Sequence, residues 1–112
     1  MNPTYQYRAI VTKAYDADTV TMDIDLGLNS WLKDQTIRLF GINAPEMRGP
    51  EKADGKRARD YLRGRIIGRE VIVETHKDKK GKYGRWLGTI YLDNVDINRA
   101  LVEAGHAEYH DY

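Results

Sequence analysis

A chain of 112 residues with 41% hydrophobic and 31% charged side chains has the size and composition of one globular domain with a modest core. No apolar run approaches the roughly 20 residues of a membrane span, and the absence of cysteine excludes disulfides and thiolate metal sites. The first ten residues lack the basic start and apolar stretch of a secretory signal, which leaves a cytoplasmic protein and the mature part of a secreted one open. We expect a monomer that does not associate with membranes.

The net charge of +1 hides an asymmetry along the chain. Residues 47–85 hold 13 Lys and Arg against 6 Asp and Glu, a net charge of +7, and the remainder carries −6. Charge segregated in this way can steer a polyanion onto one face of a protein. The alternative is a solvated helix followed by a lysine-rich loop.

The first half of the chain predicts three strands. Residues 5–13 and 20–26 alternate apolar and polar side chains, as half-buried strands do. A third alternating run covers residues 35–41. We expect Asp16 and Asp18 to lie where the first two strands are joined.

Two stretches of this half predict loops. Residues 27–35 contain Gly, Asn and Ser, and we expect Trp31 and Leu32 within them to pack back onto the sheet. Residues 47–56 are rich in glycine and charge.

The second half predicts two helices and two strands. Strand patterns cover residues 69–76 and 85–92, and the polar, glycine-containing residues 77–85 between them predict a turn. Asp96 is a favourable N-cap for a short helix that Gly105 closes. An earlier helix is indicated by an apolar stripe at helical spacing, Ala58, Tyr61, Leu62 and Ile66.

Together these elements predict an α+β fold that is mainly β. Five strands, with one helix between the third and fourth and another after the fifth, fit a closed five-stranded OB-type barrel with two helices. We find no linker or repeat, so we expect one domain covering residues 1–112. Barrels of this kind use one face and its loops to bind nucleic acids.

Four short motifs occur in an informative order. They are DADTV at 16–20, IRLFGINAPE at 37–46, KYGR at 82–85 and DINRALVEAGHA at 96–107. In this order and spacing they resemble the staphylococcal nuclease, or thermonuclease-like, family. The resemblance implies a five-stranded OB barrel and a calcium-dependent phosphodiesterase. Such an enzyme cleaves single-stranded DNA and RNA without sugar specificity and leaves 3′-phosphate ends.

The resemblance implies three catalytic residues: Arg38, Glu46 and Arg85. A planar guanidinium can bind two phosphate oxygens at once, which suits both arginines to the charge of a phosphodiester under attack. Glu46 matches the glutamate proposed to orient or deprotonate the attacking water. The residues alone also allow a strand-to-carboxylate salt bridge for Arg38, an exposed strand start for Arg85 and a loop carboxylate for Glu46.

A metal site is implied at Asp18, Asn43 and the main-chain carbonyl of Ala44. Calcium prefers carboxylate and carbonyl oxygens, and other divalent cations share that preference. Asn43 departs from the family, which usually has an aspartate there, so we expect weaker cation binding. Asp16 lies nearby and can support the site, whereas the DADT sequence alone also fits an ordinary turn.

The resemblance further implies substrate-binding residues at Lys82 and Tyr83, which match phosphate contacts, and at Tyr109 and Tyr112, which lie near a base-stacking position. Tyrosines in a β-rich protein are also common as partly buried strand residues. The chain stops before the family's third helix, so we expect part of the outer wall to be absent or replaced. Three histidines show no metal-ligand spacing: His76, His106 and His110.

Three functions are consistent with these observations. The leading one is a metal-dependent, sugar-non-specific nuclease. The second is a catalytically weak or inactive nuclease-like OB module that binds nucleic acid or a protein partner, which Asn43 and the near-neutral net charge favour. The third is a barrel used only for protein interaction.

Overall fold

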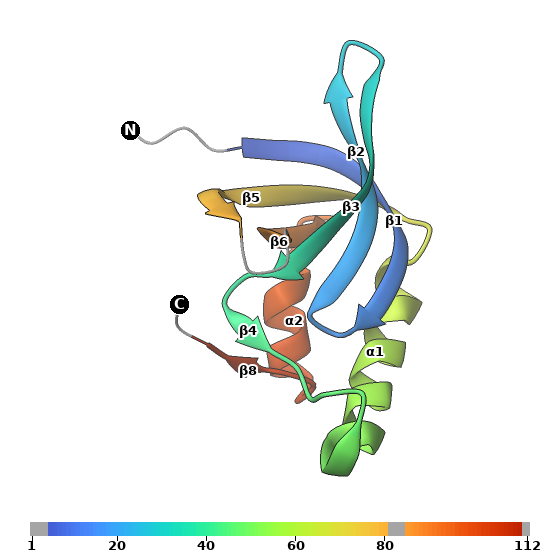
Figure 1. Cartoon of the computed structure of the whole chain (residues 1–112), viewed down its shortest axis with the longest axis vertical. Coiled ribbons are helices and arrows are strands. Elements are labelled where there is room, and N and C mark those ends of the chain that lie inside the picture. Colours follow the sequence, from blue (N-terminus) through green and yellow to red (C-terminus); the bar gives the residue numbers. More distant parts are fainter. Residues whose placement is uncertain (1–4, 81–84, 111–112) are drawn as a thin grey trace.

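The computed structural model describes residues 5–80 and 85–110, with the backbone alone for 77–80. Its main feature is a closed barrel in which the strands follow the order β3-β2-β1-β5-β6 (Figure 1). A parallel pairing of β3 with β6 at residues 37–39 closes the sheet. The five strands are β1 (Tyr5–Asp16), β2 (Thr19–Gly27), β3 (Ser30–Leu39), β5 (Glu70–Lys80) and β6 (Trp86–Leu92).

Short strands and helices surround this barrel. Strand β7 (Val95–Asp96) extends the sheet beside β6, and β4 (Ile42–Asn43) pairs with β8 (Glu108–Tyr109) in a second, two-stranded sheet. The helices are the 3₁₀ turn η1 (Gly49–Glu51), α1 (Lys52–Ile66) and α2 (Ile97–Glu103). The predicted α+β fold, a five-stranded OB-type barrel with two α-helices, is confirmed.

The core consists of apolar side chains inside the barrel. They come from alternate positions of the strands and from one face of α1. Val20, Met22 and Ile24 on β2 are at most 4% exposed, as the period of two requires. Helix α1 contributes Ala58 and Leu62 at a spacing of four residues, both fully buried. No helix within the described residues is long and apolar enough to cross a bilayer.

The hairpin between β2 and β3 differs from the prediction. A two-residue turn at Leu28 and Asn29, with φ of 56° and 59°, lets β3 begin at Ser30. This is the backbone of a tight primed turn, whose twist matches that of the flanking strands. The predicted hairpin connection is present, but it does not extend over residues 27–35, because β3 already begins at Ser30. Trp31 and Leu32 are 42% and 40% exposed on the projecting hairpin and do not pack back onto the sheet.

Two other boundaries also differ. Helix α1 begins at Lys52 directly after η1, so residues 52–56 are helical and the loop predicted there was wrong. Strand β5 continues to Lys80, so residues 77–80 belong to a strand and not to a turn. The remainder of that predicted turn, residues 81–84, lies outside the described part of the chain.

Helix α2 begins and ends as predicted. The Asp96 carboxylate caps it by accepting a hydrogen bond from the N–H of Arg99 at 3.0 Å. Gly105 has a φ of 80°, which a glycine adopts without strain, and the N–H of His106 donates to the carbonyl of Leu101. The chain then passes through residues 105–107 into β8, which lies beside β4 (Figure 1).

Candidate active site

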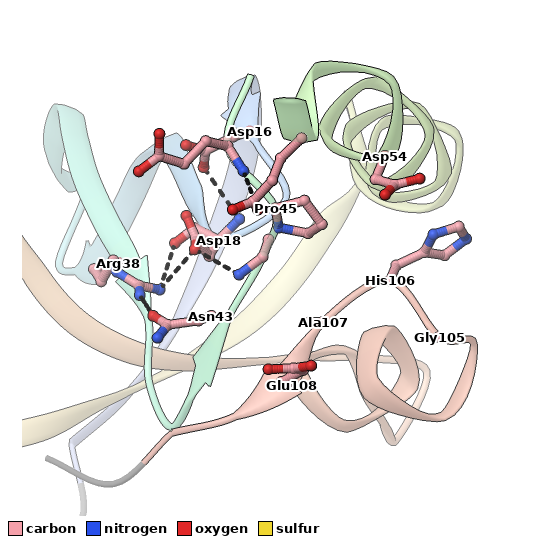
Figure 2. A pocket seen from close by; sticks show the side chains of 13 residues that line it. Asp16, Asp18, Arg38, Asn43, Pro45, Asp54, Gly105, His106, Ala107 and Glu108 are labelled. Carbon is pink, nitrogen blue, oxygen red and sulfur yellow. Dashed lines mark hydrogen bonds and ion pairs between the residues drawn. The ribbon is translucent and has the colours of Figure 1, made fainter. Parts of the chain in front are cut away.

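A cavity of about 790 Å³ lies where the β1–β2 turn, the end of β3, β4 and its following loop, the start of α1 and the α2–β8 connection meet (Figure 2). It therefore gathers residues from both ends of the chain. The lining consists of Asp16, Asp18, Arg38, Asn43, Ala44, Pro45, Glu46, Glu51, Asp54, Gly105, His106, Ala107 and Glu108.

An ion pair between Asp18 and Arg38 lies at the centre of this lining. The Arg38 Nη1 atom is 3.3 Å from Asp18 Oδ2, and each side chain is only 13% exposed. The same nitrogen donates to the carbonyls of Leu39 and Asp18 at 3.1 and 3.4 Å. The arginine on β3 thus has the carboxylate partner that a half-buried charge requires, and its guanidinium is held in one orientation.

Residues of β4 and the following loop attach to this pair. Arg38 Nη2 donates to Asn43 Oδ1 at 2.5 Å, and the N–H of Ala44 donates to Asp18 Oδ2 at 2.9 Å (Figure 2). The structure therefore brings together all three residues predicted to bind a metal. Asn43 turns its amide oxygen toward Arg38, which no feature of the sequence indicated.

A second carboxylate lies beside Asp18. The tight turn between β1 and β2 places Asp16 so that its Oδ1 accepts a hydrogen bond from the N–H of Asp18 at 3.2 Å. Burial, followed by the hydrogen bond with Asp18 and repulsion from its carboxylate, raises the pKa of the Asp16 carboxyl to about 7. The Asp16 carboxyl therefore keeps its proton up to near neutral pH, while it lies next to the Asp18 carboxylate.

Glu46 lies at the rim of the cavity. Its side chain is 68% exposed, and its carboxylate is 3.9 Å from Arg48 Nε, a loose ion pair. Its main chain is better held, because the N–H of Glu46 donates to Glu51 Oε2 at 3.3 Å. Glu46 thus shares the cavity with Asp18 and Arg38 while its carboxylate stays accessible to solvent.

The second predicted arginine, Arg85, lies next to β3 because of the barrel closure. Arg85 directly precedes β6, and the pairing of Ile37 with Trp86 sets it beside the strand that carries Arg38. Its side chain does not line the cavity in the described part of the structure. Tyr109 pairs with Ile42 and is 67% exposed, also outside the lining.

Three of the predicted substrate-binding residues, Lys82, Tyr83 and Tyr112, lie outside the described residues. Their predicted roles remain untested.

The structure adds residues that the sequence did not indicate. Glu51 and Asp54 enter the site because α1 begins earlier than predicted, and Glu108 enters because β8 pairs with β4. His106 also lines the cavity, with its ring 4.7 Å from that of Tyr61. His106 is part of the last of the four motifs, DINRALVEAGHA. Its spacing from other possible ligands did not indicate a metal site.

The charge of the lining bears on what the cavity can bind. Among the described residues it contains six carboxyl groups and one arginine. The described residues hold no cluster of three or more His, Asp or Glu side chains arranged to bind a metal by themselves. An anionic substrate would meet repulsion here unless a cation accompanied it. The oxygens of Asp18 and its neighbours are ligands that a hard cation accepts when water and backbone carbonyls complete the shell.

Comparisons with known proteins give several matches for this chain. A family model described as staphylococcal nuclease homologue matches residues 36–112, more than half of the chain. The chain is 30% identical to a thermonuclease of Staphylococcus hyicus over 100 residues, which are 87% of this chain and 56% of that protein. It is 32% identical to protein ParB of Escherichia coli over 111 residues, 91% of this chain and 56% of that protein.

A plant protein is also similar. The chain is 35% identical to the probable staphylococcal-like nuclease CAN2 of Oryza sativa subsp. japonica, over 71 residues that make up 63% of this chain and 18% of that protein. The chain spans about half the length of the first two relatives. The match over residues 36–112 includes Arg38, Asn43 and Glu46. The chain belongs to the staphylococcal nuclease family.

Proposed function

We propose that the chain is a divalent-cation-dependent nuclease that hydrolyses single-stranded DNA and RNA and leaves 3′-phosphate ends. The observation that carries the proposal is the Asp18–Arg38 pair, 3.3 Å apart inside a cavity large enough for a nucleotide. A carboxylate that can hold a cation and a guanidinium that can hold a phosphate are adjacent there. Membership of a nuclease family supports the same reaction.

The cation would be held by Asp18, Asn43 and the carbonyl of Ala44. These donors fit calcium, because they are all oxygens and the surrounding lining carries an excess of carboxylates. When bound, the ion supplies positive charge beside the phosphate. Asn43 contributes no charge of its own, and its oxygen also accepts the Arg38 hydrogen bond, so we expect weak cation binding.

The remaining chemistry belongs to Arg38, Arg85 and Glu46. The two guanidiniums bind the non-bridging phosphate oxygens, whose negative charge grows during attack. The Glu46 carboxylate orients the water and accepts its proton. The new bond joins the water oxygen to phosphorus and the bond to the 5′ oxygen breaks. One product then keeps a 3′-phosphate, and the other gains a proton on its 5′-hydroxyl.

Cleavage of single-stranded DNA with calcium, with and without a chelator, tests this proposal. We expect Arg38→Lys, which keeps the charge beside Asp18 but loses the planar fork, to cleave about 10²- to 10³-fold more slowly. Arg99→Ala is the matched control, since Arg99 is 68% exposed on α2 and pairs with Glu103 outside the cavity. Wild-type protein that leaves DNA intact, or an Arg38→Lys variant as fast as the control, would contradict the proposal.

A binding module that does not cleave is the second candidate. It is favoured by the hydrogen bond between Arg38 and Asn43, which ties up the guanidinium and one of the proposed metal ligands. Salt-dependent binding of DNA by a protein that forms no product with any divalent cation would support this function instead.

A further inference from the structure

Gly55 lies on α1 where the helix backbone touches the loop that carries Glu46. It is buried, and a Cβ atom at this position would lie 2.2 Å from the carbonyl oxygen of Glu46 and 3.0 Å from that of Pro45. The first distance is shorter than real Cβ contacts allow, the second is tighter than nine in ten of them, and both obstacles are backbone atoms. Only glycine lets the helix and the loop approach this closely.

The other glycine of the same helix shows that the contact is specific. A Cβ atom at Gly64 would meet no atom within 4 Å. Both glycines weaken a helix relative to alanine, but only Gly55 has a neighbour that excludes a side chain. The two positions therefore form a matched pair within one element.

Two hydrogen bonds also hold the main chain of the loop next to Gly55. Ala44 donates its N–H to Asp18 at 2.9 Å, and Glu46 donates its N–H to Glu51 at 3.3 Å. The Glu46 side chain itself is 68% exposed with only a loose ion pair. The backbone of the loop, and not contacts of the side chain, thus determines where the Glu46 carboxylate can reach.

We infer that Gly55 is a positioning residue for Glu46. Because Gly55 has no side chain, the loop packs directly against α1, and this contact places the Glu46 carboxylate where it can act on the attacking water. This inference rests on the proposed nuclease function. An ordinary carbon–oxygen contact is about 3.3 Å, so a methyl group at position 55 displaces the Glu46 carbonyl by about 1 Å. A misplacement of about 1 Å in a catalytic group can lower a rate about 10²-fold. Figure 2 shows Pro45 of this loop between Asp18 and α1.

The test compares Gly55→Ala with Gly64→Ala in cleavage of single-stranded DNA at saturating calcium. We expect Gly55→Ala to lower kcat about 10- to 100-fold while KM and the calcium requirement stay within about twofold. Gly64→Ala should keep the wild-type kcat and raise the Tm by a few degrees, because alanine favours the helix. A wild-type kcat in Gly55→Ala would overturn the inference.

A double-mutant cycle with Glu46→Gln distinguishes positioning from a general loss of structure. If Gly55 acts through Glu46, adding Gly55→Ala to Glu46→Gln should cause little further loss of kcat. Equal losses in both backgrounds would show that Gly55 acts elsewhere. Glu51→Ala is a second variant, which removes the acceptor of the Glu46 N–H without adding a side chain to α1. It should lower kcat as Gly55→Ala does, and this loss should also be small in the Glu46→Gln background.

A measurement without activity separates this inference from the proposed function. The amide resonances of Ala44 and Glu46 should move in Gly55→Ala and stay in place in Gly64→Ala. Wild-type protein that cleaves no nucleic acid would refute the nuclease function, whereas unmoved resonances would refute the positioning role whether or not the protein cleaves.

Discussion

Replacing Asn98 tests how the barrel holds the strands that carry the two arginines. Asn98 on α2 is 4% exposed, and its Nδ2 donates to the carbonyls of Phe40 and Gly88 at 3.0 and 3.1 Å. Its Oδ1 accepts from the N–H of Ile90 at 3.1 Å. One side chain thus joins the end of β3 to β6 next to the point where the barrel closes.

The cost of Asn98→Ala follows from these bonds. The buried N–H of Ile90 loses its acceptor, while the carbonyl of Gly88 still accepts the N–H of Phe40 at 2.8 Å. The orphaned buried donor costs about 1–3 kcal/mol and the two lost bonds to the carbonyls about 1 kcal/mol each, so we expect a loss of about 3–5 kcal/mol. Total stabilities are about 5–15 kcal/mol, so the variant should remain folded at 25 °C.

Urea unfolding followed by tryptophan fluorescence measures this loss. We expect a lower midpoint with an unchanged m-value. Asn98→Asp keeps the acceptor for Ile90 but turns an oxygen toward the two carbonyls, so it should be at least as destabilising near neutral pH. Glu103→Ala, which removes an exposed ion pair from the same helix, should cost no more than about 0.5 kcal/mol. A loss below about 1 kcal/mol in Asn98→Ala would refute the role we assign to this side chain.

Two further predictions concern the metal and pH. Asn43→Asp adds a charged oxygen beside Asp18, so it should lower the calcium concentration needed for half-maximal cleavage; an unchanged calcium titration would show that position 43 is not a ligand. Burial lowers the pKa of His76 against the opposing effect of Glu74, so the unfolded chain binds the proton more readily. The contribution of His76 to the free energy of unfolding is therefore fully present above about pH 6.5 and is lost as the pH falls through the folded-state pKa. We expect the free energy of unfolding of His76→Gln to fall less than that of wild type between about pH 7.5 and 5. Parallel stability profiles in urea unfolding would contradict this.

The barrel could be predicted because its strands follow a simple rule. Alternating apolar residues on β1 and β2 specify which face is buried, and this pattern can be recognised without knowledge of tertiary contacts. The missed boundaries have local causes. Leu28 is not a residue expected at a positive φ, so the tight turn was not indicated.

Helix α1 was predicted to start late because residues 47–56 are rich in glycine and charge, and Gly55 is one of these glycines. The structure explains this glycine, since it is the contact point with the Glu46 loop. Gly55, which is unfavourable in a helix interior, thus lies in contact with the candidate site.

The candidate site was accessible to sequence reasoning only where a motif marked it. Asp18, Arg38 and Asn43 lie in two of the four motifs, and the structure places them in one cavity. Glu51 and Glu108 were not predicted to line the site. No sequence pattern specifies where the helical segment around Glu51 begins or that β8 pairs with β4. The hydrogen bond from Arg38 to Asn43 depends on side-chain orientation, which a sequence does not encode locally.

The proposed nuclease function requires that the cavity at Asp18 holds a cation during cleavage of nucleic acid. Cleavage of single-stranded DNA by wild type and by Asp18→Asn, each measured across a range of calcium concentrations, tests it most directly. Asparagine can still accept the N–H of Ala44 but removes one charged ligand, so we predict that the variant needs at least about tenfold more calcium and that a chelator stops the wild type. Identical calcium curves for the two proteins, or wild-type cleavage that survives the chelator, would contradict the claim.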